Sequence, residues 1–194
     1  MRPRLRILDL ATGTGDLAFL ASSRGAAVVG LDITWRMLEL ATAKKTGAAP
    51  TFVRADMLAL PFADATFDVI TTGYGIRNVP VLDRALDEVA RVVRRDGQFL
   101  SLDFDRPANR ALRSLYLAYL TVVGSLLGLL LHGDPDTYRY IPESMRQYPG
   151  SAAVAQMLRA RGFTRTEVIP VLGGLLAIHH ASRGDRGDRE DGRR

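Results

Sequence analysis

The 194-residue sequence contains no cysteine, which excludes disulfides, thiolate metal ligands and thiol chemistry. Aromatic residues make up only 7% of it, and the arginines are scattered rather than gathered in a basic stripe with interleaved aromatics. We therefore expect no nucleic-acid partner, despite a formal net charge of +5. The chain also lacks a charged-then-apolar segment at its start, so we expect it to remain in the cytoplasm.

The length and a hydrophobic content of 47% fit one globular domain whose core is large enough to fold without cross-links. We expect this domain to span residues 1–181. Residues 182–194 have the charged composition of a disordered end. His179 and His180 close the last expected strand without acidic partners at ligand spacing, so we expect no metal site.

The stretch from Ile7 to Asp16 predicts a ligand-binding turn. Its apolar run breaks at Gly13 and Gly15 and then becomes helical. Glycine allows a positive φ and lets a bound molecule lie against the peptide plane, while free N–H groups at the helix start favour a carboxylate or phosphate. The pattern alone also fits a dinucleotide site, with Asp32 about 20 residues further on as the ribose ligand.

Strands alternate with helices through the first hundred residues. Apolar runs predict strands at 7–10, 27–31, 51–55, 67–72 and 98–102, with helices after Gly15, Thr34 and Asp83. A turn over residues 95–97 is expected to lead into the fifth strand. Two further runs, 165–169 and 175–179, are joined through glycines and predict a hairpin. We therefore expect one α/β domain with a Rossmann-like, doubly wound, mostly parallel seven-stranded sheet and an antiparallel last strand.

Polar residues at the strand ends favour one kind of ligand. Asp9, Asp32, Asp56 and Gly73 all lie at carboxyl ends of predicted strands, where open α/β sheets bind ligands. An acid ahead of the first glycine is unfavourable for a pyrophosphate but suits a ligand with an ammonium and a sulfonium. The spacing and the final hairpin resemble the class I S-adenosylmethionine-dependent methyltransferases, which implies S-adenosylmethionine as the cofactor.

Several motifs accompany the glycine turn, and two of them, at 75–78 and 138–144, are much more specific than the turn itself. They are Leu60-Pro61-Phe62, Phe67-Asp68, Gly75-Ile76-Arg77-Asn78-Val79, Asp83-Arg84-Ala85-Leu86, Arg91-Val92-Val93 and Tyr138-Arg139-Tyr140-Ile141-Pro142-Glu143-Ser144. Together they resemble the C-methyltransferases of menaquinone and ubiquinone biosynthesis. This resemblance implies methylation of a polyprenyl naphthoquinol, with demethylmenaquinol preferred, or of the related benzoquinol. A methyltransferase for another small hydrophobic acceptor and a cofactor-binding domain without catalysis are the alternatives.

Three features depart from the pattern of these enzymes. They normally carry a helical segment ahead of the first strand, and here the sequence begins close to that strand, which would weaken closure over the cofactor. Their Lys-Pro-Gly-Gly stretch corresponds here to residues 94–97, which we expect to be a surface turn. Gly73 stands where some members have a serine that touches the cofactor.

The resemblance implies a role for each candidate cofactor residue. Thr14 would lie against the methionine part of the cofactor, and Asp32 would accept hydrogen bonds from both ribose hydroxyls. Asp56 would take the exocyclic amine of the adenine, and Met57 would cover the adenine face. The remaining cofactor candidates are Asp9, Thr12, Gly13, Gly15, Ile33 and Gly73.

Two of these acids also have structural interpretations. Asp9 either belongs to the cofactor site or only ties down the glycine turn through backbone N–H groups. Asp32 either binds the cofactor or caps the helix that begins near Thr34.

Methylation of an aromatic carbon requires stabilisation of a phenolate-like oxygen. Arg77 is a permanent cation in the loop after the fourth strand, and the resemblance implies that it stabilises the negative charge on this oxygen. Alternatively, Arg77 caps the next helix or pairs with Asp83. Asn78 and Tyr74 flank it and are candidates to hydrogen-bond the quinol oxygens. Three proton acceptors remain open: His132, Asp103 and a bound water.

No residue from Ser114 to Leu131 is charged. A membrane-spanning helix needs about 20 apolar residues, but this segment contains two glycines and spanning would sever the domain. We expect it to be buried against the sheet. Contact of this helix with a polyprenyl tail or with the inner face of the membrane is the alternative. Self-association into a homo-oligomer also remains open.

Overall fold

The computed structural model describes residues 4–44, 49–105, 110–133 and 140–184. Its first half alternates strands and helices, as the apolar runs predict. These elements are β1 (Arg6–Leu10), α1 (Asp16–Ser23), β2 (Ala27–Asp32), α2 (Trp35–Ala43), β3 (Thr51–Arg54), β4 (Phe67–Gly73), the short 3₁₀ helix η1 (Ile76–Asn78) and α3 (Leu82–Val92).

The second half begins with the longest strand and then becomes mostly helical before the final hairpin. Its elements are β5 (Val93–Phe104), α4 (Arg110–His132), α5 (Tyr140–Gln147), α6 (Ser151–Ala160), β6 (Arg165–Val171), the 3₁₀ turn η2 (Leu172–Gly174) and β7 (Leu176–Ser182).

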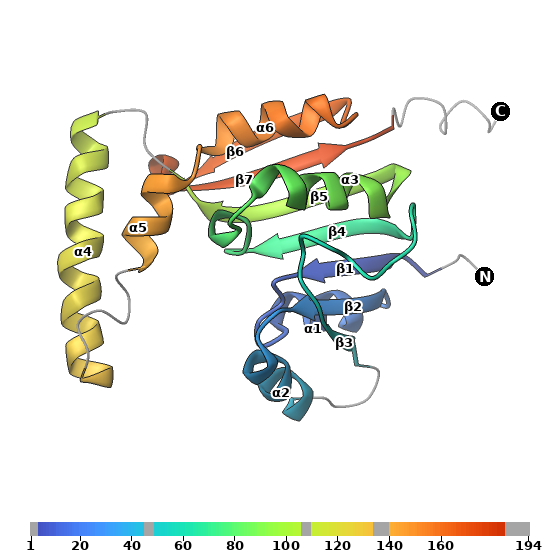
Figure 1. Ribbon diagram of the computed structural model, residues 1–194, viewed down its shortest axis with the longest axis horizontal. Coiled ribbons are helices and arrows are strands. Elements are labelled where there is room, and N and C mark those ends of the chain that lie inside the picture. The colour runs from blue at the N-terminus through green and yellow to red at the C-terminus, as the bar shows by residue number, and fades with distance from the viewer. Residues whose placement is uncertain (1–3, 45–48, 106–109, 134–139, 185–194) are drawn as a thin grey trace.

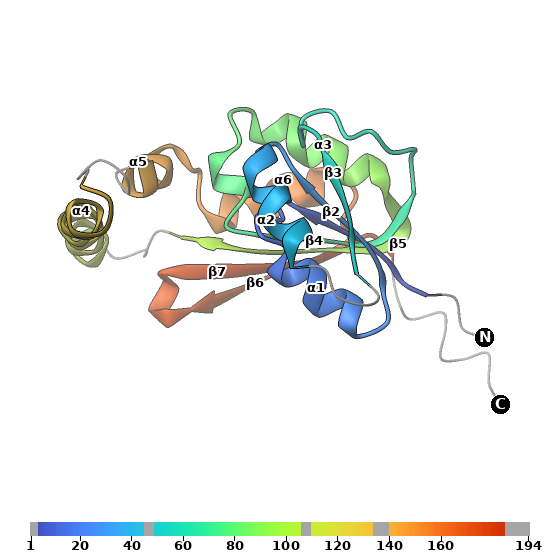
Figure 2. The same cartoon turned by 90° about the horizontal axis from the view of Figure 1, so that it is seen from below.

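One sheet of seven strands organises the molecule, in the order β3-β2-β1-β4-β5-β7-β6. The pairs among β1 to β5 are parallel, and β7 runs antiparallel to both β5 and β6. Figure 1 shows the parallel arrows pointing toward the end of the sheet where α5 and α4 lie. Figure 2 shows α1 on one face of the sheet and α3 and α6 on the other. The predicted fold class and the antiparallel last strand are confirmed.

The core lies between the central strands and the helices that cover them. Leu8, Ile70 and Phe99 come from β1, β4 and β5 and are fully buried. Leu86 and Val89 of α3 pack into the same cluster, because their spacing places both on one face of the helix. Burial on both faces of the sheet explains why these strands read as continuous apolar runs.

The prediction of a turn over residues 95–97 is wrong. β5 begins directly after α3 and runs through these residues, which bulge between the pairings that β5 makes with Phe67 and Val69 of β4. A Cβ added at Gly97 would lie 2.9 Å from the carbonyl oxygen of Asp68. Glycine is therefore needed here because two strands approach closely, rather than because the chain reverses direction.

The prediction that the uncharged segment 114–131 is buried against the sheet is also wrong. α4 lies apart from the sheet in Figure 1, and the element that it contacts most is α5. Its exposed large side chains define the α4 apolar stripe: Leu115, Tyr119, Val122, Leu126, Leu129 and Leu130. Among the described residues, no helix has the length and apolar content required to span a bilayer.

Two elements differ from the expected boundaries. α6 was not predicted, although Val154, Ala155 and Leu158 are buried at helical spacing. Ordered structure also continues past residue 181, because Ser182 pairs within β7 and the Arg183 guanidinium donates to the carbonyl of Ala90. Residues 185–194 of the expected tail lie outside the described part of the chain.

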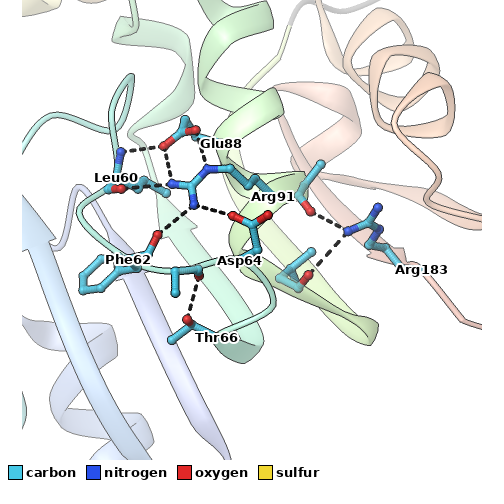
Figure 3. A network of polar contacts seen from close by, with 10 residues as sticks. Leu60, Phe62, Asp64, Thr66, Glu88, Arg91 and Arg183 are labelled. Carbon is cyan, nitrogen blue, oxygen red and sulfur yellow. Dashed lines mark hydrogen bonds and ion pairs between the residues drawn. The ribbon is translucent and has the colours of Figure 1, made fainter.

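A network around Arg91 ties the loop after β3 to α3 (Figure 3). The Arg91 guanidinium donates to the carbonyl oxygens of Phe62 at 2.7 Å and Leu60 at 3.0 Å. It also pairs with the carboxylates of Glu88 at 2.7 Å and Asp64 at 2.9 Å. The hydrogen bonds from Arg91 hold the pKa of Glu88 below its usual value. The network thus fixes an apolar loop that has no regular secondary structure.

A buried histidine joins β5, β7 and α6. The ring of His179 is 2.9 Å from the Ser101 hydroxyl through Nδ1 and 2.9 Å from the Ser151 carbonyl oxygen through Nε2. Because a carbonyl only accepts, Nε2 carries the proton and Nδ1 accepts from Ser101. Burial lowers the pKa of His179, with a smaller opposing contribution from the Ser151 carbonyl. Folding therefore favours the neutral ring.

This arrangement predicts a pH-dependent contribution to stability. The unfolded state binds a proton more readily than the folded state, so the free energy of unfolding falls as the pH drops below the ordinary histidine value of about 6.5. The slope contributed by His179 is at most about 1.4 kcal/mol per pH unit. Urea titrations between pH 5 and pH 8 should show that His179→Asn loses this component and His180→Asn keeps it. An unchanged pH slope in His179→Asn contradicts the assignment.

Candidate functional site

The glycine turn lies across the carboxyl ends of β1 and β2. The backbone N–H of Thr12 donates to the Leu31 carbonyl at 2.9 Å, and Gly15 starts α1 with a φ of 84°. Gly13 has a φ of 55°, and a Cβ added there would meet no atom within 4 Å. The turn thus presents an open backbone surface on which a ligand can lie.

The carboxylate of Asp9 holds the glycine turn in place. It accepts hydrogen bonds from the hydroxyls of Thr12 and Thr71, both at 2.6 Å. Asp9 is buried, and burial raises its pKa while the two hydroxyls oppose that shift. Asp9 therefore ties down the glycine turn, which is one of the two roles that the sequence left open. It does so through the side-chain hydroxyls of Thr12 and Thr71 rather than through backbone N–H groups.

Asp32 connects the glycine turn to α2. One carboxylate oxygen accepts the Gly13 N–H at 2.9 Å and the other accepts the Thr34 N–H at 2.8 Å. Thr34 is the N-cap residue of α2 but makes no side-chain cap hydrogen bond. Asp32 therefore has the structural role that we weighed against cofactor binding. Each oxygen still retains one acceptor position for a further donor.

The other cofactor candidates line the same end of the sheet. Asp56 is exposed and accepts the Leu58 N–H through one oxygen, while Met57 is half-buried against the core. Ile33 is 59% exposed beside Asp32, which is a high exposure for a large apolar side chain. Thr14 donates its hydroxyl to Asp16 at 3.1 Å.

This arrangement fits S-adenosylmethionine. The carboxylate of Asp32 has two acceptor positions left for two ribose hydroxyls, and the surface in front of Gly13 is open. The second oxygen of Asp56 and the exposed side chain of Ile33 offer an acceptor and an apolar surface for an adenine. Gly73 leaves the end of β4 without a side chain, although a Cβ there would lie 3.2 Å from Leu17.

Arg77 forms a buried ion pair that the sequence did not predict. Its guanidinium lies 2.8 Å from Asp103, and the two side chains are 3% and 2% exposed. Asp103 also accepts the backbone N–H of Arg77 at 3.1 Å. The expected alternative pairing with Asp83 is wrong, because Asp83 pairs with Arg161. Within the described residues, Nε of Arg77 is buried without a hydrogen-bond partner.

Tyr74 and Asn78 surround this arginine. The Tyr74 carbonyl accepts from Arg77 at 3.0 Å and from the Asn78 amide at 3.3 Å. The Phe104 ring lies 4.8 Å from the guanidinium carbon and 5.2 Å from the Tyr74 ring centre. Tyr74 takes a left-handed φ of 58° and leaves its side chain 42% exposed. The structure therefore brings the three candidate catalytic residues together.

A pocket of about 430 Å³ opens beside Arg77, between η1 and α5. Arg77 and Asn78 line one wall, and Glu143, Ser144 and Gln147 of α5 line the other. Glu143 lies within the Tyr138–Ser144 motif, and the sequence predicted no individual role for it.

The η1 loop also lies directly against the glycine turn. A Cβ added at Gly75 would lie 2.7 Å from the Ala11 Cβ and 2.6 Å from the Thr72 hydroxyl. The loop that lines one wall of the pocket is thus in contact with the turn that would hold the cofactor.

Two of the proton acceptors that the sequence left open are side chains, Asp103 and His132. Asp103 already accepts three hydrogen bonds, from the side chain and backbone of Arg77 and from the Phe104 N–H, which makes it an anchor for Arg77. The side chain of His132 lies outside the described residues. In the described part of the chain, no three His, Asp or Glu residues are grouped so as to hold a metal ion.

The fold and the strand-end acids define a class I S-adenosylmethionine-dependent methyltransferase. The model of the ubiE/COQ5 methyltransferase family matches residues 1–183, and the chain belongs to this family. It is 42% identical over 183 residues to a demethylmenaquinone methyltransferase of Thermus thermophilus, covering 92% of this chain and 82% of that protein. It is 40% identical to a ubiquinone/menaquinone biosynthesis C-methyltransferase of Rhizobium leguminosarum, covering 91% and 71%.

Solved structures share the fold at lower identity. A phosphoethanolamine N-methyltransferase of Haemonchus contortus, crystallised with S-adenosylhomocysteine, superposes with a TM-score of 0.68 at 15% identity, covering 95% of this chain and 50% of that one. The PH0226 protein of Pyrococcus horikoshii gives 0.65 at 23% identity, covering 94% and 83%. These likenesses confirm the fold class and, with the family, S-adenosylmethionine as the cofactor.

Asp32 offers a direct test of the cofactor geometry. Removing a charge-assisted hydrogen bond to a ribose costs about 1.5–3 kcal/mol, so Asp32→Asn should weaken S-adenosylhomocysteine binding about 10- to 100-fold in isothermal titration. Asn keeps an acceptor oxygen for only one of the Gly13 and Thr34 N–H groups, so circular dichroism has to show that the variant is folded. The exposed variant Asp87→Asn is the control, and NADH should show no saturable binding. Unchanged affinity in a folded Asp32→Asn variant removes Asp32 from the cofactor site.

Proposed function

We propose that this methyltransferase transfers a methyl group to a ring carbon of demethylmenaquinol, with the related benzoquinol as a second acceptor. The observation that carries this proposal is the 42% identity to a demethylmenaquinone methyltransferase over almost the whole chain. The 40% identity to a ubiquinone/menaquinone C-methyltransferase supports the second acceptor. The pocket beside Arg77 supports a planar acceptor with polar substituents, since it has polar groups on both walls.

The cofactor residues act by binding and orienting. Asp32 accepts the ribose hydroxyls, Asp56 accepts the adenine amine, and Met57 and Ile33 contact the adenine ring. Thr14, with the backbone of Thr12, Gly13 and Gly15, holds the methionine part, and Gly73 leaves room at the end of β4. Asp9 keeps the turn in position through Thr12 and Thr71.

Catalysis depends on stabilising negative charge on the acceptor oxygen. When bound, the sulfonium supplies an electrophilic methyl group, and an aromatic carbon attacks it only when the adjacent oxygen carries negative charge. Arg77 is held by Asp103 and Phe104, and its buried Nε–H has no hydrogen-bond partner among the described residues, so we assign this group as the donor to that oxygen. A donor fixed in advance stabilises the transition state without reorganisation. Asn78 and Tyr74 orient the quinol.

The first experiment is a methyl-transfer assay with the purified protein. With S-adenosylmethionine and a short-chain demethylmenaquinol, we expect mass spectrometry to detect a product heavier by one methylene unit. The oxidised quinone is the control and should not react, because it has no hydroxyl to ionise. Absence of product from the naphthoquinol and from the benzoquinol contradicts the proposed function.

Arg77→Lys tests the mechanism in the same assay. Alanine is unsuitable because it leaves Asp103 buried without its cation, at a cost of roughly 3–5 kcal/mol. Lysine keeps the charge but has no Nε–H donor in the guanidinium position. We expect kcat to fall about 100-fold, with S-adenosylhomocysteine affinity within about threefold of wild type. A kcat within about threefold of wild type excludes the donor role.

The polyprenyl acceptor dissolves in lipid, and we propose that the α4 apolar stripe contacts the inner membrane surface. Its exposed leucines lie beside α5, which forms one wall of the acceptor pocket. A helix that lies in the interface with its apolar side chains among the acyl chains would bring this pocket to the substrate. The protein would then be a peripheral protein on the cytoplasmic side.

Vesicle sedimentation tests this contact. We expect the protein to sediment with phospholipid vesicles, and the double variant Leu126→Gln, Leu130→Gln to remain in the supernatant. The control Leu5→Gln changes a leucine of similar exposure, 56%, which lies just before β1 at the opposite end of the sheet. Equal sedimentation of all three proteins contradicts the proposed contact. Light scattering of the same samples shows whether the stripe instead pairs two copies of the chain.

A further inference from the structure

The proposed catalytic residues Arg77, Asn78 and Tyr74 include no carboxylate or imidazole that could take a proton from the acceptor. Deprotonating the quinol hydroxyl makes the neighbouring carbon nucleophilic, but Arg77 can only donate. Asp103 is occupied by three donors. His179 lies between Ser101 and Ser151 in the core, where both of its ring nitrogens have partners. The pocket walls are therefore the place to find the group that removes the proton.

Glu143 is the carboxylate on those walls. It lies in the first turn of α5 and lines the pocket together with Gln147, one turn later on the same face. Arg77 and Asn78 line the opposite wall. An acceptor oxygen in this space meets a fixed donor from one wall and a carboxylate from the other, which is the pair of partners that a hydroxyl losing its proton requires.

We propose that Glu143 is the general base for the acceptor hydroxyl. This assignment rests on the proposed function, since it needs a hydroxylated aromatic ring in the pocket. An acid in the first turn also stabilises a helix through its dipole, and that purely structural role is the alternative that the experiment has to separate.

Methyl transfer begins with loss of the acceptor proton. The O–H bond breaks and its proton goes to the Glu143 carboxylate, while the oxygen electrons enter the ring. The ring carbon forms a bond to the methyl carbon, and the carbon–sulfur bond breaks with its electron pair on sulfur, which gives S-adenosylhomocysteine. The methylated carbon then loses its hydrogen as a proton to water, and the ring oxygen regains a proton from Glu143. The net product besides the thioether is one proton.

Chemical rescue distinguishes a base from a helix-stabilising residue. Loss of a positioned base lowers the rate by about 100-fold or more, and we expect this loss in kcat for Glu143→Ala. Added formate should then restore kcat at least tenfold in this variant, in a saturable manner, and have no effect on wild type or Arg77→Lys. The control Glu167→Ala, on the distant strand β6, should keep wild-type kcat with and without formate.

A binding measurement gives a readout independent of turnover. With S-adenosylhomocysteine present, wild type should bind 1-naphthol about tenfold more tightly than 1-methoxynaphthalene, which has no hydroxyl proton to donate. Glu143→Ala should lose this preference while its S-adenosylhomocysteine affinity stays unchanged.

A kcat within about threefold of wild type, or a loss that formate does not relieve, overturns the assignment of Glu143. An unchanged preference for 1-naphthol does the same. Failure of the proposed function has a different signature, because wild type itself then methylates no quinol.

Discussion

The position of Asp9 is the constraint on which the ligand-binding end of this molecule depends. Asp9 of β1 lies opposite Thr71 in the register of the two central strands, and its carboxylate binds the hydroxyls of Thr71 and Thr12. One buried group thus joins β1, β4 and the glycine turn. Because leaving the buried Thr12 hydroxyl unpaired would cost free energy, its bond to Asp9 favours this conformation of the turn.

A second carboxylate extends this arrangement outward. Asp32 binds the N–H groups of Gly13 and Thr34, so the turn is fixed at the end of β2 as well as at the ends of β1 and β4. Holding the turn and offering acceptor positions to a ligand are compatible, since a carboxylate has about four lone-pair directions. The two interpretations of Asp32 that the sequence presented as alternatives are therefore compatible in the geometry of one side chain.

The sequence predicted well where local pattern decides the structure. The alternation of strands and helices, the glycine turn and the final hairpin all follow from periodicity and from glycine. Prediction from the sequence failed where contacts between residues far apart in the chain decide the structure. The bulge at residues 94–97 exists because β4 and β5 meet there, and the partner of Arg77 is Asp103, on a strand that no local pattern links to it. The position of α4 away from the sheet likewise depends on tertiary packing, which an uncharged run of residues does not reveal.

The contact at Gly75 has a consequence for how the two halves of the site respond to each other. Its backbone packs against Ala11 so closely that not even a methyl group fits between them, so the glycine turn and the η1 loop share one wall. A ligand that lies against the turn is therefore in contact with the same backbone that borders the neighbouring loop. By thermodynamic linkage, any change in acceptor affinity that the cofactor causes through this shared backbone equals the change in cofactor affinity that the acceptor causes.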